Sequence, residues 1–336
     1  MGRIAWDYRE KILCLLANAA LMEPNSPSQI SSLKEAGIWL WRYDNQTFPR
    51  SGEDLLRELG RNLDEWLPNT VTLGYKGPLL WQGTPTPLAK HLLADLSRNA
   101  FEERDRIISK AIQLSSDIGK PISEFREFIK RYVAQPIVLK DNPIPCEILS
   151  LLYNDDVERY RSLGIKICSV CGYFFHPDCQ SFSCHPYCPR DRSGLNTTAS
   201  HHLEAIPAVG LIPLLWRTVG APLIMERRIL DFFNTSPRAN NLVVVPNPDV
   251  PGVIIVDGSR RVDLDIIGTM HAQSVVDYYN KDTRACDIWL VIPDYSAPLF
   301  ASLQYRIDNK RIKRVSVTGL KTEVFKKLFG IRGHRW

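Results

Sequence analysis

The first half of the chain carries a helical pattern of apolar residues. Apolar side chains recur there at intervals of three and four residues, which places them on one face of a helix. The pattern predicts helices over residues 7–22, 51–66, 86–98, 100–116, 121–133 and 146–153. Residues 67–88 are rich in Pro, Gly and Thr, which favours a long loop or a small hairpin. We therefore predict an all-helical domain over residues 1–155, with the role of a scaffold or docking unit.

From residue 220 onward, helical and strand patterns alternate. The periodicity predicts helices over residues 222–235, 272–282, 296–308 and 320–329, and strands over residues 241–246, 252–257, 261–267, 287–292 and 312–318. Asp257-Gly258 lies between two strand-like runs and indicates a tight hairpin. Strand 287–292 is apolar after Asp287, as is typical of a central strand covered on both faces. The predicted fold class is multidomain α+β, with a C-terminal α/β domain over residues 215–336.

Length and composition indicate a soluble multidomain protein. A chain of 336 residues is long enough for two or three domains. Hydrophobic residues make up 44% and charged residues 24%, which excludes collagen-like and wholly disordered classes. Asp7, Arg9, Glu10 and Lys11 precede any apolar run, so neither a signal peptide nor a membrane-spanning helix fits the N-terminus. We expect a cytoplasmic protein with no membrane partner.

The excess of positive charge lies in the last part of the chain. Residues 205–336 contain 18 basic and 12 acidic residues, whereas the rest of the chain is nearly balanced. A phosphate backbone is the natural partner of such an excess. The candidate contacts are Arg306, Lys310, Arg311, Lys313 and Arg314. The alternative is a solvated basic face at a helix end.

Five of the eight cysteines lie between residues 168 and 188. Cys168 and Cys171 are separated by two residues, twelve residues follow, and Cys184 and Cys188 are separated by three. Two thiolate pairs at this spacing complete a tetrahedral site for a structural Zn²⁺ ion. Gly172 suits the tight turn after the first pair. The spacing predicts a zinc knuckle over residues 160–195, between the other two domains.

Other ligand sets remain open within this knuckle. His176, Cys179 and His185 are spare candidates, and Cys179 with Cys184 forms an alternative second pair. The segment resembles the short CxxCGxxF and CxxxC knuckles of treble-clef-like modules. We expect a structural role, because a catalytic zinc site needs an open position beside a general base.

The element order and the acids of the C-terminal domain resemble the PD-(D/E)xK superfamily, the restriction-endonuclease-like fold. In that family one Asp opens the second strand of a hairpin pair and a second acid lies on the next strand. The resemblance assigns these roles to Asp249 and to Asp263 with Asp265, and it matches Glu226 to an additional helix acid. It implies that the carboxylates gather around Mg²⁺ to hydrolyse a phosphodiester.

The chain departs from the family at one position. The family's lysine is replaced by Asp265, and an aspartate there can bind metal but cannot orient water as an ammonium group does. Some members bring a lysine from the next helix, for which Lys281 is the candidate. Loss of catalysis is the rival explanation.

The whole chain resembles the nuclease-like component of the prokaryotic PIWI-RE three-gene islands. The resemblance rests on EFREFIKRYVAQPIV (residues 124–138), the knuckle, and VDLDIIG followed by DIWLVIPD. It implies an Argonaute-like protein and a DinG-type helicase as partners. The leading hypothesis is a DNA-cleaving subunit of a bacterial defence or mobile-element system. The alternatives are a catalytically inactive DNA-binding module and a zinc-containing structural adaptor.

Overall fold

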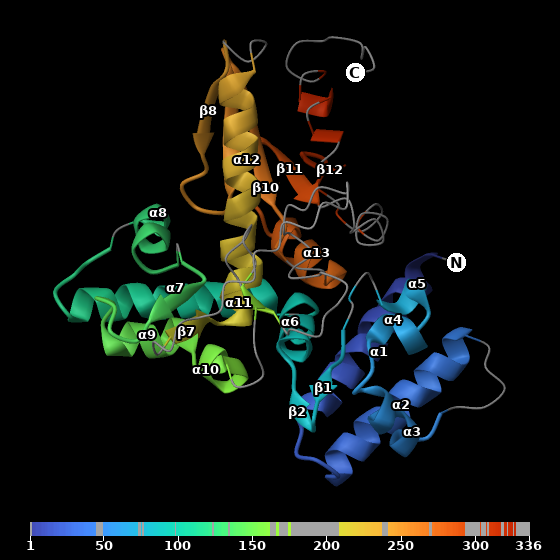
Figure 1. Cartoon of the computed structure of the whole chain (residues 1–336). Helices are drawn as coiled ribbons and strands as arrows, with labels where there is room; N and C mark the ends of the chain where they lie inside the picture. The colour runs from blue at the N-terminus through green and yellow to red at the C-terminus, as the bar shows by residue number, and fades with distance from the viewer. Residues whose placement is uncertain are drawn as a thin grey trace.

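The structure is a computed structural model that describes most of the chain outside the predicted knuckle. It describes residues 2–44, 50–72, 75, 77–97, 99–122, 124–133, 135–161, 166–167, 174–175, 208–236, 241–268, 271–292, 303, 307, 309–316, 319–320, 322–324 and 326. The largest sheet of the described residues has five strands. Figure 1 shows it at the top with the long helix α12, and two groups of helices below it. None of the described helices has the length and apolarity needed to cross a membrane.

The N-terminal helices form the first of these groups. They are α1 (Gly2–Leu21), α2 (Pro27–Asp44), α3 (Gly52–Glu58), α4 (Leu63–Trp66), α5 (Asn69–Thr72) and α6 (Pro87–Asp95). The expected small hairpin is β1 (Leu80–Trp81) with β2 (Thr84–Pro85). The Ser51 hydroxyl accepts a hydrogen bond from the Asp54 N–H at 3.1 Å and so caps α3. Helix α2 was missed by the sequence analysis, although its buried Leu33, Ala36 and Leu40 have helical spacing.

The prediction that residues 1–155 are all-helical is wrong. Helices α7 (Ala100–Asp117), α8 (Phe125–Phe128), the π-helix η1 (Ile129–Val133), α9 (Cys146–Leu152) and α10 (Asp156–Arg161) alternate with β3 (Ile137–Leu139) and β4 (Tyr153–Asn154). Both strands pair with β7 (Ala208–Leu211) in a three-stranded antiparallel sheet of order β3-β7-β4. The pairing partner lies beyond the knuckle in sequence. A short strand that depends on so distant a partner carries little local signal.

The C-terminal elements follow the predicted order closely. After α11 (Pro213–Leu215) and the π-helix η2 (Trp216–Gly220) come α12 (Ala221–Thr235), β8 (Val243–Pro246), β9 (Gly252–Asp257), β10 (Arg260–Ile266), α13 (Ala272–Asn280), β11 (Asp287–Ile292) and β12 (Ile312–Ser316). The sheet order is β12-β11-β10-β9-β8. Strands β8, β9 and β10 are antiparallel, whereas β10, β11 and β12 are parallel. The predicted hairpin is present, with Gly258 at φ 56°. The predicted helix 296–308 lies largely outside the described residues.

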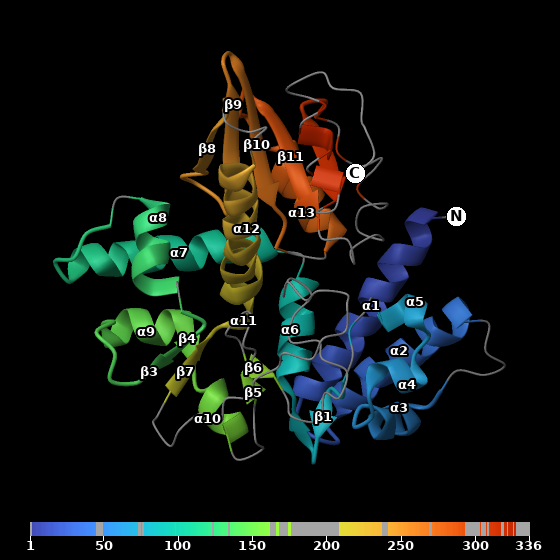
Figure 2. The same cartoon turned by 45° about the horizontal axis from the view of Figure 1, so that its top comes forward.

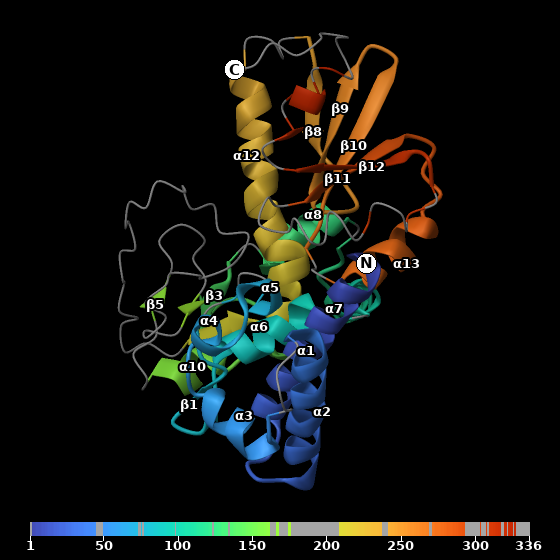
Figure 3. The same cartoon turned by 90° about the vertical axis from the view of Figure 1, so that its right-hand side faces the viewer.

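Helices α12 and α13 cover opposite faces of this sheet (Figure 3). Val262, Leu264 and Ile266 of β10 pack with α12, together with Trp289 and Val291 of β11. The other side chains of β11, Ile288, Leu290 and Ile292, pack in a second apolar cluster with α13. Strand β11 is therefore buried on both faces, as its apolar sequence predicted.

The N-terminal helices support the sheet through α13. The Phe101 ring of α7 lies 4.6 Å from the Tyr278 ring, centroid to centroid. The Ser274 hydroxyl donates a 3.0 Å hydrogen bond to the Ser97 carbonyl. One apolar cluster runs from α1 and α2 to α13 and β11. Figure 2 shows α13 between the sheet and the N-terminal helices, so these helices fix one wall of the site described below.

Candidate nucleic-acid-binding site

Asp263 and Asp265 of β10 lie on the face of the sheet that α13 covers. Strand geometry directs residues 263 and 265 to one side and their apolar neighbours to the other. The sequence predicted this shared face. It did not predict that the face is closed, and Asp263 is 0% and Asp265 1% exposed. Two carboxylates at such depth need compensating partners.

Two arginines and a tyrosine satisfy all four carboxylate oxygens. Arg261 donates from Nε to Asp263 Oδ1 at 2.7 Å and from Nη2 to Oδ2 at 3.0 Å. Arg284 donates from Nη1 to Asp265 Oδ1 at 3.1 Å and from Nη2 to Oδ2, and its Nη1 lies 3.6 Å from Asp263 Oδ2. The Tyr279 hydroxyl of α13 also donates to Asp265 Oδ2, at 3.1 Å. The guanidinium groups therefore take the place that a bound cation would need.

The electrostatics of this network follow from burial. Burial raises the pKa of Asp265, and the hydrogen bonds from Arg284 and Tyr279 oppose that rise without reversing it. Burial by itself would lower the pKa of Arg284, but its hydrogen bonds to Asp265 and Asp282 outweigh burial and raise the pKa. Burial and the neighbouring Asp263 carboxylate raise the pKa of the Cys286 thiol, so that thiol is a poor nucleophile.

Glu226 lies on the other side of the sheet and has its own arginine. Arg126 of α8 donates from Nη1 and Nη2 to the two Glu226 oxygens, at 2.7 and 2.9 Å. The Gly252 N–H donates to Glu226 Oε2 at 2.7 Å. Arg126 also donates to the carbonyls of Asn247, Val250 and Gly252 in the β8–β9 connection. Burial raises the pKa of Glu226, and Arg126 opposes that rise.

This clamp joins α8, α12 and the sheet, so its loss has a measurable effect on stability. We expect Arg126→Ala to lower the free energy of unfolding by about 3 kcal/mol, because Glu226 is left charged and buried with the Gly252 N–H but without an opposite charge. Urea-induced unfolding measures the change.

The matched control for this substitution is Arg131→Ala. Arg131 pairs with Glu127 in the same part of the chain, and both side chains are more than a third exposed. Its loss is expected to cost less than about 0.5 kcal/mol. Equal costs for the two variants would show that the buried pair contributes nothing beyond a surface pair.

The carboxylates do not gather as the nuclease resemblance implied. Asp249 is exposed in the β8–β9 connection, where its N–H donates to Asn247 Oδ1 at 3.1 Å. Glu226 lies across the sheet from Asp263 and Asp265. Across the described part of the chain, no three His, Cys, Asp or Glu side chains are grouped to hold a metal ion. The Asp263 and Asp265 carboxylates do not fit Mg²⁺, because each of their four oxygens already accepts a hydrogen bond from a protein donor.

Basic side chains from the start of β10 and from the loops before β11 and β12 meet at one end of the sheet. Because β10, β11 and β12 are parallel, their first residues lie side by side, with Val262 opposite Asp287 and Ile288 opposite Ile312. Arg311 Nη1 donates to the Arg284 carbonyl at 3.5 Å, which joins the two loops. We call this cluster the basic rim, and it comprises Arg260, Arg261, Arg284, Lys310 and Arg311.

The basic rim presents cations outward and keeps its acids inside. Arg260, Arg261, Lys310 and Arg311 are exposed, whereas Asp263 and Asp265 are buried and lie on the same face of β10 as Arg261. An open pocket of about 540 Å³ lies between the loops, lined by Ser259, Arg261, Arg284, Ala285, Cys286 and Asp287. Such a surface suits contact with phosphate groups.

The predicted basic cluster is divided by the structure. Lys310 and Arg311 join the basic rim, Lys313 and Arg314 alternate along β12, and Arg306 lies outside the described residues. The sequence analysis missed Arg260, Arg261 and Arg284. A sequence signal for them existed, because Arg260 and Arg284 precede predicted strands, as Lys310 and Arg311 do, and Arg261 is the first residue of one. Lys281, the candidate replacement for the family's lysine, is exposed at the end of α13, and Arg284 occupies the place beside the acids.

The predicted zinc ligands Cys168, Cys171, Cys184 and Cys188 lie outside the described residues, as do the alternatives His176, Cys179 and His185. The described strands β5 (Lys166–Ile167) and β6 (Phe174–Phe175) pair antiparallel, with Ile167 opposite Phe174.

No protein-family model, curated protein or solved structure matches the chain.

Proposed function

We propose that the chain is a noncatalytic nucleic-acid-binding module with a restriction-endonuclease-like C-terminal domain. The observation that carries the proposal is the neutralised acid pair beneath the basic rim. The element order from α12 to β12 and the two acids on β10 support the relation to nucleases. The hydrogen bonds from Arg261 to Asp263 and from Arg284 to Asp265 favour a catalytically inactive binding module over phosphodiester hydrolysis with Mg²⁺.

The basic rim supports binding of a phosphate backbone. Its cations come from the start of β10 and from two separate loops, so the fold holds them in one array instead of along a single flexible segment. Exposed arginine and lysine side chains that release counterions from nucleic acid give affinity that falls steeply with salt. We propose DNA as the partner, bound through backbone contacts.

The knuckle and the N-terminal helices extend this proposal to an assembly. Cys168 and Cys171 belong to the six residues between the paired strands β5 and β6, and this position supports a structural Zn²⁺ site at a hairpin. The packing of α7 against α13 supports a scaffold role for the N-terminal half. We further propose that the module works in a bacterial defence system beside an Argonaute-like protein and a helicase, as the PIWI-RE resemblance implies.

A binding and cleavage assay tests the proposed function. Purified protein is titrated with labelled DNA over a range of salt and incubated with plasmid and single-stranded DNA in Mg²⁺ or Mn²⁺. We expect salt-dependent binding without cleavage. Lys310→Gln/Arg311→Gln is expected to weaken binding about tenfold and to reduce the salt slope by about two.

The matched control removes two exposed cations that do not belong to the basic rim. Lys34→Gln/Lys110→Gln makes the same change in net charge and is expected to leave DNA affinity unchanged. Cleavage that Asp263→Ala abolishes would overturn the noncatalytic assignment and restore the nuclease hypothesis. Absence of both binding and cleavage would favour the structural adaptor.

A further inference from the structure

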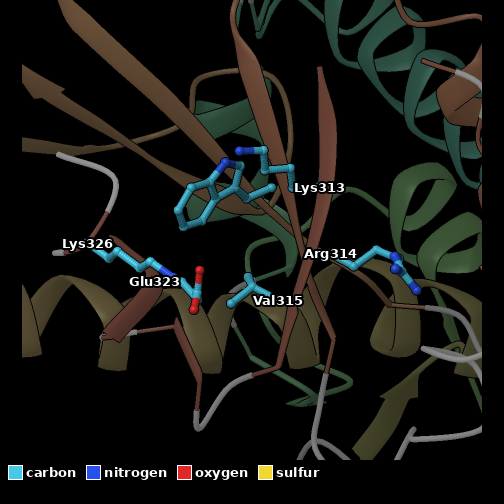
Figure 4. A pocket seen from close by; sticks show the side chains of 6 residues that line it. Lys313, Arg314, Val315, Glu323 and Lys326 are labelled. Carbon is cyan, nitrogen blue, oxygen red and sulfur yellow. The ribbon is translucent and has the colours of Figure 1, made fainter. Parts of the chain in front are cut away.

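A second pocket lies on the opposite face of the sheet from the acid pair. It has a volume of about 390 Å³ and is lined by Trp289, Lys313, Arg314, Val315, Glu323 and Lys326. Trp289 and Val315 belong to the apolar cluster that packs with α12. Figure 4 shows Lys313 reaching over the pocket from β12, with Glu323 and Lys326 on the other side and Arg314 directed away.

Hydrogen-bond donors predominate in this pocket. The Trp289 side chain is buried, and its Nε1 has no hydrogen-bond acceptor among the described residues. Lys313 Nζ lies 5.9 Å from the centroid of the Trp289 ring. Lys313 and Lys326 are exposed, and neither forms an ion pair with another residue that the structure describes. A buried donor without an acceptor is unfavourable, so an acceptor-rich ligand would stabilise this arrangement.

The lining selects among acceptor-rich ligands. Two free ammonium groups and an indole N–H suit a phosphate group. Glu323 is the acidic member of the lining and would repel a bare anion, but it can accept hydrogen bonds from sugar hydroxyl or base amino groups. The volume is within the range of small-molecule sites. A phosphate group attached to a nucleoside matches both the lysine ammonium groups with the indole N–H and the Glu323 carboxylate.

We propose that this pocket binds a nucleoside monophosphate unit, with its phosphate group at Lys313, Lys326 and the Trp289 N–H and its nucleoside toward Glu323. The unit is either a free nucleotide or the 5′ end of a nucleic-acid strand. The site is separate from the basic rim and does not depend on it. The two faces of the sheet would then contact nucleic acid or nucleotide independently.

The test follows the Trp289 indole N–H resonance of the full chain by nitrogen-15 NMR during titration with adenosine 5′-monophosphate. Absence of the resonance in Trp289→Phe identifies it. We expect it to shift with saturation by the monophosphate, and to respond at least about tenfold more weakly to adenosine and to inorganic phosphate. Lys313→Gln/Lys326→Gln is expected to weaken binding about tenfold or more.

The control is Lys310→Gln, which removes a nearby lysine outside the pocket and is expected to leave monophosphate binding unchanged. Displacement of the nucleotide by a 5′-phosphorylated oligonucleotide, but not by its 5′-hydroxyl form, assigns the site to strand ends. Lack of displacement by both assigns it to free nucleotides. An unshifted Trp289 resonance, or equal affinity in the double variant, would overturn the proposal. Because the Lys310→Gln/Arg311→Gln assay reports on the basic rim, the two proposals fail separately.

Discussion

Replacement of Arg284 by alanine is expected to lower the free energy of unfolding by about 4 kcal/mol. Arg284 donates to both oxygens of Asp265 and lies 3.6 Å from Asp263 Oδ2, so its loss leaves two buried carboxylates with reduced compensation. Asp263 would keep Arg261, and Asp265 would keep only the Tyr279 hydroxyl. Urea-induced unfolding at pH 7 measures the loss.

The pH dependence of this variant distinguishes charge burial from lost packing. Burial already raises the pKa of Asp265, and removal of Arg284 would raise it further. A carboxyl group whose pKa is higher in the folded state than in the unfolded chain binds protons preferentially when folded. Its stabilising contribution is therefore present at low pH and lost as pH rises through the raised pKa. The deficit of Arg284→Ala is expected to shrink as pH falls from 7 toward 5.

Two further variants complete the Arg284 experiment. Lys281→Ala removes an exposed cation three residues away and is expected to change stability by less than about 0.5 kcal/mol. Adding Asp265→Asn to Arg284→Ala removes the uncompensated charge and is expected to recover part of the stability. A pH-independent deficit without recovery in the double variant would show that packing, and not charge, accounts for the effect.

Loss of the zinc ligands is expected to destabilise the central region of the chain more than Arg284→Ala does. Apparent zinc binding energies of about 10–16 kcal/mol are typical of structural sites in small modules, where binding and folding are coupled. We expect one zinc ion per chain, and Cys168→Ser and Cys188→Ser are each expected to lose it. Metal analysis and thermal unfolding, with and without a chelator, measure the loss.

Two cysteine controls test the choice of ligands. Cys179→Ser is expected to retain zinc, because the preferred second pair is Cys184 with Cys188. Cys146→Ser changes an exposed cysteine of α9 and is expected to leave the metal content unchanged. Loss of zinc from Cys179→Ser with retention by Cys188→Ser would establish the alternative pair. A metal-free wild-type chain would contradict the knuckle.

Local sequence patterns predicted the C-terminal domain better than the middle of the chain. The strand at residues 287–292 was placed with the bounds that the structure gives, because its apolar run fits burial on both faces. The strands β3 and β7 were missed, since they are short and pair across about 70 residues of sequence. The periodicity of apolar residues and the turn residues report on local structure, whereas pairing between strands far apart in sequence leaves no periodic signal.

The acids of β10 show the same division between local and tertiary information. Alternation along the strand determined that Asp263 and Asp265 share a face. The cysteine spacing predicts a zinc site but leaves its second ligand pair open. Only the tertiary structure decided that α13 buries that face, that Arg284 lies against Asp265, and that Arg126 meets Glu226 100 residues away. The physical reason is that side-chain direction follows from local backbone geometry, while burial and ion pairing depend on distances in space. The change from an expected magnesium site to arginine-neutralised acids therefore came from packing.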